Sequence, residues 1–276
     1  MAMTHASFVE RLAAREPLLG TILTLPSPEA AEIFAGAGFD WLFVDMEHGL
    51  FDFPSVQRIV QATTGRCACV VRVPSNEAIW INKALDTGAA GVIVPHVDGP
   101  EQARLAVRAA KYPPEGERSI GVARAQAFGR RLTDSIAHAN HETVLVAQAE
   151  HVSAARAIDD IVSVPGVGAI FIGPFDMSAS LGHPGRLEEP SVREAINLVR
   201  DGCANREMPC GILVADATGA RAAFSAGYSL VCVATDTLLL ARIAAEVVRA
   251  AAPTPDAEPE VSTKRRGRAR RPAARE

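Results

Sequence analysis

The sequence has few cysteines, few aromatic residues and no long hydrophobic run. Its five cysteines are odd in number and form no CxxC pair, which argues against a disulfide framework or a cysteine-based zinc site. We interpret them as reduced, mostly buried thiols. No apolar run approaches the roughly 20 residues that span a bilayer, and the first residues carry charges where a secretory signal would be apolar. We therefore expect a cytoplasmic protein with no membrane partner.

The sequence also lacks the usual signals of nucleic-acid-binding proteins, of doubly wound sheets and of repeat solenoids. The chain has 276 residues and a formal net charge of -4, so its overall charge favours no nucleic-acid partner. Neither GxGxxG nor GxxxxGK[ST], the phosphate-binding loops of many doubly wound sheets, occurs in it. Its successive units share a pattern but not a sequence, which argues against a repeat solenoid.

Apolar strand-like runs alternate with helix-like segments along most of the chain. Eight such runs cover residues 19–25, 41–45, 67–73, 91–97, 144–149, 168–172, 211–215 and 229–234. Ser27 is placed to cap the first intervening helix, with Pro28 as its first residue. Eight β-α units predict an α/β protein with a single-domain (β/α)8 TIM barrel, which we assign to residues 1–252.

The composition changes at Pro253. Residues 253–276 are rich in proline and then basic, with almost no apolar side chains, which predicts a disordered C-terminal tail. The basic run from Lys264 to Arg275 could contact nucleic acid or another acidic surface. We favour a solvated tail, because blocks of like charge are usually disordered.

Ionisable residues follow the predicted strands. The carboxyl ends of parallel strands form the ligand-binding face of α/β folds. The second run ends at Asp45, with His48 close behind, and Arg72 lies among apolar residues near the end of the third. Arginine is costly to bury without an anion, so Arg72 is either a structural ion-pair partner or a ligand-binding residue. By itself His48 is better explained as a satisfied polar residue, and His96 as a packing residue.

Two carboxylates follow adjacent strand-like runs. Glu150 follows the fifth run, and Asp176 follows the sixth after Gly173 and Pro174. Each could simply cap the next helix. Side by side, however, they could share a divalent cation, and oxygen ligands suit Mg²⁺ or Mn²⁺.

Several separated motifs, in order along the chain, are GTILTLPSPEAAEIFAGAGFDWLFVDMEHG, VVRVPSN, ALDTGAAGVIVPHV, KYPPEGERSIG, VAQAE and IFIGPFDMSASLG. Because of these motifs, residues 19–250 resemble the metal-dependent class II 2-keto-3-deoxy-acid aldolases of the HpcH/HpaI family. That family includes 4-hydroxy-2-oxoheptanedioate aldolase and 2-dehydro-3-deoxyglucarate aldolase.

The resemblance implies a role for each matching residue. Glu150 and Asp176 would ligate the divalent cation, Mg²⁺ or Mn²⁺, with Co²⁺ and Zn²⁺ left open. Arg72 would contact the keto acid and stabilise its enolate, and His48 would be the catalytic base. Asp86 would pair with His48. Asp45 would hold other site residues in position without contacting the substrate or the metal itself. The pyruvate carboxylate would lie against Gly173, Pro174, Phe175 and Asp176.

The predicted reaction is the reversible cleavage of a 4-hydroxy-2-oxo acid to pyruvate and an aldehyde. No lysine stands at a strand end where it could form a Schiff base, which argues against a lysine-dependent aldolase. Phe175 and Ile22 depart from the residues common in the family, which leaves the aldehyde undetermined. The resemblance also implies a homo-oligomer, a hexamer built as a trimer of dimers.

Two alternatives are kept. One is a citramalyl- or malyl-CoA-type lyase, although no basic pocket for the CoA phosphates is evident. The other is a non-catalytic binding barrel whose tail engages nucleic acid.

Overall fold

The computed structural model describes residues 5–252. The chain divides into two compact units, with the boundary between Leu240 and Ala241. The first unit contains all eight strands, and the second contains the remainder of the last helix. The predicted tail, residues 253–276, lies outside the described residues.

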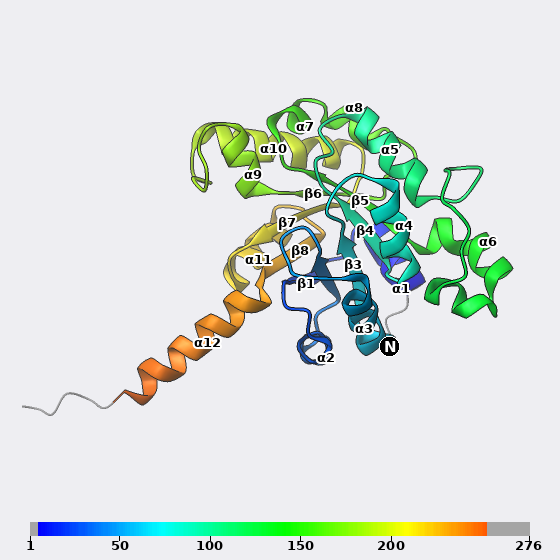
Figure 1. Cartoon of the computed structure of the whole chain (residues 1–276). Coiled ribbons are helices and arrows are strands. Elements are labelled where there is room, and N and C mark those ends of the chain that lie inside the picture. Colours follow the sequence, from blue (N-terminus) through cyan, green and yellow to red (C-terminus); the bar gives the residue numbers. More distant parts are fainter. Residues whose placement is uncertain (1–4, 253–276) are drawn as a thin grey trace, which may run out of the picture. The chain divides into compact units, whose positions relative to one another are not determined.

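The strands form a closed, entirely parallel barrel in which each strand pairs with its neighbours in sequence and β8 pairs with β1 (Figure 1). The strands are β1 (Leu18–Leu23), β2 (Trp41–Asp45), β3 (Ala68–Arg72), β4 (Gly91–Val94), β5 (Val144–Ala149), β6 (Ala169–Ile172), β7 (Cys210–Val214) and β8 (Leu230–Thr235). The predicted (β/α)8 barrel is confirmed, and the predicted strands differ from the observed ones only at their ends.

Helices precede, separate and follow the strands. They are α1 (His5–Ala13), α2 (Pro28–Ala37), α3 (Phe53–Thr63), α4 (Ala78–Asp86), α5 (Pro100–Ala110), the 3-10 helix η1 (Arg124–Gly129), α6 (Leu132–Glu142), α7 (Val152–Arg156), α8 (Ile158–Val162), α9 (Pro174–Ser180), α10 (Pro190–Asn205), α11 (Ala217–Ser225) and α12 (Asp236–Ala251). The Ser27 hydroxyl accepts a hydrogen bond from Ala30 N at 3.1 Å, which confirms the predicted start of α2.

Four aromatic side chains form a cluster inside the barrel. Trp41, Phe43 and Phe171 are buried there with ring centroids 5.4–6.2 Å apart. From α1, Phe8 packs on Trp41 at 6.5 Å, near the amino ends of the strands. The aromatic cluster therefore fills the barrel interior from the amino ends of the strands and leaves the carboxyl ends for a ligand.

The five cysteines are free and buried, as expected from the sequence. Among the described helices, none has the length and apolar character that crossing a membrane requires.

Candidate active site

A cavity of about 360 Å³ opens at the carboxyl ends of the strands. It brings together seven of the nine predicted site residues, from β2, β3 and the segment after β6: Asp45, His48, Arg72, Gly173, Pro174, Phe175 and Asp176. Gln148, near the end of β5, also lines it. These residues therefore lie together at the carboxyl-end face of the barrel.

Arg72 is held by two carboxylates. The register of β2 and β3 places Asp45 directly beside it, and Arg72 donates from Nε and Nη2 to the two Asp45 oxygens at 2.9 and 2.7 Å. Arg72 Nη1 lies 3.1 Å from Glu47 Oε2, and the Phe43 ring centroid is 5.1 Å from the guanidinium carbon. Burial by itself lowers the pKa of Arg72, but the hydrogen bonds to Asp45 and the charges of Asp45, Glu47 and Glu150 more than offset it, so its pKa is raised. The arginine is therefore a fixed positive charge in the cavity wall.

Asp45 also shapes the turn after β2. One of its oxygens accepts hydrogen bonds from the backbone N–H groups of Glu47 at 3.1 Å and His48 at 3.2 Å. Because the side chain is almost fully buried, these bonds and the Arg72 pair use its hydrogen-bonding capacity. Asp45 thus connects the turn that carries Glu47 and His48 to the arginine of the next strand.

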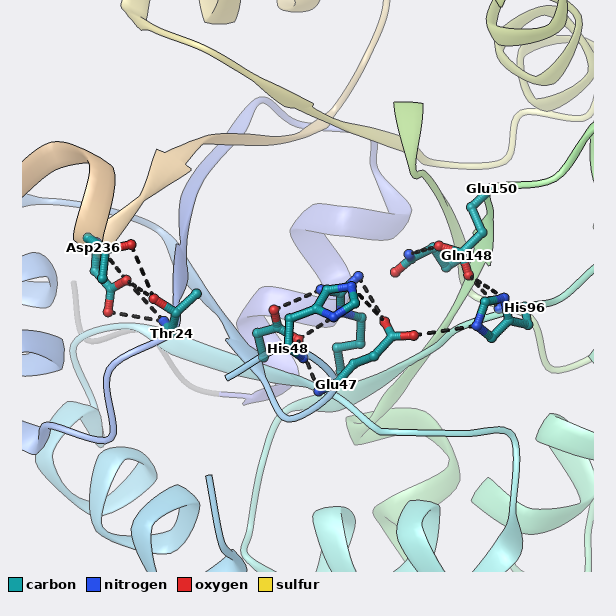
Figure 2. A network of polar contacts seen from close by, with 10 residues as sticks. Thr24, Glu47, His48, His96, Gln148, Glu150 and Asp236 are labelled. Atoms are coloured by element: carbon teal, nitrogen blue, oxygen red, sulfur yellow. Dashed lines mark hydrogen bonds and ion pairs between the residues drawn. The ribbon is translucent and has the colours of Figure 1, made fainter. Parts of the chain in front are cut away.

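Glu150 is a buried carboxylate with mainly neutral partners. Its Oε1 accepts from His96 N at 2.7 Å and lies 3.2 Å from His96 Nδ1, while Gln148 Nε2 donates to Oε2 (Figure 2). Burial raises the pKa of Glu150 despite the opposing effect of these contacts. Gly173 lies against it so closely that a Cβ there would stand 2.7 Å from Glu150 Cβ. A glycine at this position lets the loop after β6 approach Glu150.

The residues present fit a divalent cation. Asp176 is exposed in the first turn of α9 and lines the same cavity as Gln148. Gln148 Oε1 is buried and without a hydrogen-bond partner in the described structure. Within residues 5–252, no group of three or more histidine, cysteine or acidic side chains is arranged around one ion position. Hard cations bound by one or two carboxylates normally keep several waters, so two acids and neutral oxygens suffice.

His48 and Asp86 are not brought together. His48 is largely exposed at the cavity, and its imidazole Nε2 lies 4.0 Å from Glu47 Oε2. Asp86 is the last residue of α4 and accepts a hydrogen bond from Arg118 Nη2 at 3.0 Å. Because α4 leads into the start of β4, Asp86 lies at the amino end of the barrel. The predicted pair is therefore not formed between these residues of one chain.

A family model described as HpcH/HpaI aldolase/citrate lyase matches residues 19–242. This chain belongs to that family. A hydroxypyruvate/pyruvate aldolase of Deinococcus radiodurans is 41% identical over 240 residues, 86% of this chain and 87% of the relative. A 4-hydroxy-2-oxo-heptane-1,7-dioate aldolase of Klebsiella pneumoniae is 40% identical over 238 residues, 86% of this chain and 90% of the relative.

Among solved structures, an HpcH/HpaI aldolase/citrate lyase family protein from Burkholderia cenocepacia superposes with a TM-score of 0.85 at 35% identity. The match covers 89% of this chain and 98% of that one. These comparisons confirm the resemblance to the HpcH/HpaI family that the sequence motifs indicate, over nearly the whole described barrel.

Two ionisable residues of this site, Glu47 and His96, were not predicted. Glu47 bridges Arg72 and His96, with Oε1 3.4 Å from His96 Nε2. The expectation that His96 only packs is wrong: its imidazole is 64% exposed and contacts both Glu47 and Glu150 (Figure 2). Its backbone is left-handed, with φ 54°, which aims its N–H at Glu150. The sequence held a signal for Glu47, which lies between Asp45 and His48, but none for the His96 backbone.

Proposed function

We propose that this protein is a divalent-metal-dependent aldolase that cleaves a 4-hydroxy-2-oxo acid to pyruvate and an aldehyde and catalyses the reverse addition. The observation that carries the proposal is the fixed guanidinium of Arg72 in a cavity beside the buried carboxylate of Glu150. Support comes from relatives named as aldolases, including a 5-keto-4-deoxy-D-glucarate aldolase of Escherichia coli at 36% identity.

Glu150 and Asp176 would hold the cation, for which we propose Mg²⁺ or Mn²⁺. When bound, such an ion supplies Lewis-acid polarisation of the keto-acid carbonyl. Glu150 fits this role because its burial disfavours an unpaired negative charge, as its raised pKa shows, and a cation would relieve that cost. Gly173, Pro174, Phe175 and Asp176 would accommodate the pyruvate carboxylate.

Arg72 would bind the oxygen on which negative charge develops. During cleavage the C3–C4 bond breaks and its electron pair becomes the enolate of pyruvate. A charge that is already oriented needs no rearrangement as the enolate forms, and such preorganised electrostatics usually provide the largest part of catalysis. Asp45 and Glu47 supply that orientation by holding three of the guanidinium nitrogens.

His48 would move the proton. In cleavage it would take the proton of the C4 hydroxyl, and in addition it would return a proton to the aldehyde oxygen. Its side chain is exposed at the cavity and so has access to a substrate there. General acid–base catalysis of this kind contributes about 10²- to 10⁴-fold. We still propose Asp86 as the partner of His48, although the two side chains are not in contact within one chain.

We further propose a cytoplasmic homohexamer arranged as a trimer of dimers, with residues 253–276 as a solvated tail outside a domain of residues 1–252. The apolar sequence of α12, LLLARIAAEVV, supports self-association, since such a segment favours burial. Light scattering on the purified chain would test the hexamer.

The decisive experiment measures pyruvate release from 4-hydroxy-2-oxo acids by the full chain with and without EDTA. We expect activity to disappear on chelation, to return with Mg²⁺ or Mn²⁺, and to fall about 10²- to 10³-fold in Arg72→Ala. Arg104→Ala, on the exposed surface of α5, is the matched control and should behave as wild type.

Other results would reject parts of the proposal. Activity that survives EDTA would exclude the proposed metal dependence. Cleavage of malyl-CoA or citramalyl-CoA without cleavage of free hydroxy-oxo acids would instead favour a CoA-thioester lyase.

A further inference from the structure

The cavity wall formed by β1 and β8 differs from the wall that carries the charged residues. It presents the apolar side chain of Ile22 and the hydroxyl groups of Thr24 and Thr235, and Leu213 of the neighbouring β7 adds a second apolar side chain. In the barrel order, β8 and β1 lie across from β4 and β5, and Figure 2 shows Thr24 and Asp236 well apart from His96 and Glu150. Among the described residues that line the cavity, Arg72 is the sole arginine and there is no lysine. The β1–β8 wall is therefore neutral and mixed in polarity.

Thr24 is held by a buried carboxylate. Thr24 Oγ1 donates to Asp236 Oδ1 at 2.7 Å, and Thr24 N lies 3.0 Å from the same carboxylate. Asp236 is 2% exposed and also accepts from Leu25 N at 2.9 Å and Thr237 N at 2.8 Å. The loop after β1 and the start of α12 are thus joined at one point. Because Thr24 gives its single hydroxyl proton to Asp236, its oxygen is left as an acceptor.

Thr235 belongs to the same group of hydroxyls. Its Oγ1 accepts from Leu238 N at 3.1 Å and lies 2.9 Å from Thr237 Oγ1, which is 3.3 Å from Thr24 Oγ1. A hydroxyl has one donor and two acceptor positions, so Thr235 can direct its proton either to Thr237 or to a ligand. The wall therefore offers one fixed acceptor and one adaptable donor.

We propose that Thr24 and Thr235 form the aldehyde subsite and select aldehydes that carry a hydroxyl group close to the carbonyl. This inference rests on the proposed aldolase function, in which the keto-acid half lies against Arg72. The aldehyde half then meets the neutral wall. An aldehyde that ends in a carboxylate finds no cation there, and a plain alkyl aldehyde leaves the remaining hydrogen-bonding capacity of the two threonine hydroxyls without a ligand partner.

The chemistry of the step is that of a simple aldol addition. Pyruvate loses a proton from C3, C3 forms a bond to the aldehyde carbon, and the aldehyde oxygen takes up a proton to become the C4 hydroxyl. No oxidant or reductant is required. A site built to hydrogen-bond a substrate hydroxyl discriminates strongly against the analogue that lacks it, because the polar groups of the site are then left unpaired.

The test compares aldol addition of pyruvate by the metal-loaded full chain to glyceraldehyde, propionaldehyde and succinic semialdehyde. We expect kcat/KM to be highest for glyceraldehyde in wild type. In Thr24→Val and in Thr235→Val, the ratio of kcat/KM for glyceraldehyde over propionaldehyde should fall about tenfold, mainly through KM. Since a hydroxyl near the carbonyl also changes intrinsic reactivity, the change in the ratio between proteins is the informative quantity.

The controls separate a specific effect from misfolding. Thr24→Ser keeps the hydroxyl and should restore the wild-type ratio, and Thr133→Val, exposed on α6, should leave it unchanged. An unaltered ratio in both valine variants, or a wild-type preference for propionaldehyde or succinic semialdehyde, would overturn the inference. Deuterium exchange at the pyruvate methyl group, which needs no aldehyde, reports the proposed function separately. Without exchange that function itself fails, whereas exchange with no hydroxyl preference refutes this inference alone.

Discussion

At the scale of single residues, the ion pair between Arg72 and Asp45 gives the site its rigid positive charge. Both side chains are nearly fully buried, and arginine cannot lose its charge at any physiological pH. Removing the carboxylate charge would leave a buried guanidinium with only part of its compensation. This residue pair therefore matters to folding as well as to the proposed chemistry.

Asp45→Asn is expected to lower the free energy of unfolding by about 3 kcal/mol. This loss is near the lower end of the range for breaking a buried ion pair, because Glu47 still compensates part of the Arg72 charge. Urea denaturation followed by circular dichroism measures it. Asp201→Asn, which removes an exposed partner of Arg200, is the control and should change stability by no more than about 0.5 kcal/mol. Equal losses in the two variants would contradict this account.

Residue identity alone indicated some of these side chains and not others. Arg72 stands out in the sequence because an arginine between buried apolar residues needs an anion. Glu150 stands out because it ends a strand. His96 gave no such sign, since its contact with Glu150 requires a left-handed backbone and a partner 54 positions further along the chain.

At the scale of elements, helix starts follow from local sequence. Ser27 before Pro28, and Asp52 before α3, each accept a hydrogen bond from a backbone N–H two or three residues into the helix. These bonds join residues close in sequence, so the pattern is readable without a fold. The division of the helical segment between β5 and β6 into α7 and α8, by contrast, follows no evident local signal.

Ser27→Ala should lower the free energy of unfolding by about 1 kcal/mol, because the first turn of α2 loses its cap. Thermal and urea unfolding would both report the loss. Ser27→Asp retains a capping oxygen and should stay close to wild type. If the aspartate variant is destabilised as much as the alanine variant, the cap is not the cause.

At the scale of the whole molecule, closing the barrel buries every cysteine. Burial raises the pKa of Cys69 from 9.0 to about 11, opposed only in part by its hydrogen bond with Thr63. Burial likewise raises the pKa of Cys67 and Cys232. The folded barrel therefore favours neutral thiols, and an unfolded chain does not.

Stability should consequently fall in alkaline solution. Unfolded Cys69 ionises from about pH 9 and folded Cys69 only near pH 11, so the unfolded state binds fewer protons between these values and the free energy of unfolding decreases as pH rises. One thiol contributes up to about 1.4 kcal/mol per pH unit in that window and keeps its full stabilising effect below pH 9.

Urea unfolding under reducing conditions at pH 8, 9 and 10 tests this. Cys69→Ala should show a shallower decline of the free energy of unfolding with pH than wild type. Val70→Ala, a buried truncation with no ionisable group, should be less stable than wild type by the same amount at each pH. Parallel declines in wild type and Cys69→Ala would contradict the assigned cause.

The sequence by itself determined the barrel, its strand order and the identity of the ionisable residues that line the cavity. It could do so because strand periodicity, helix caps and strand-end positions are local features, and parallel β-α units have few ways to close. Only the tertiary structure decided which of those residues touch. It placed Asp86 at the barrel end away from His48, and it added Glu47, which contacts Arg72, and His96, which contacts Glu47 and Glu150. It also joined Thr24 to Asp236, 212 positions apart, because such contacts depend on the register and closure of strands that are distant in sequence.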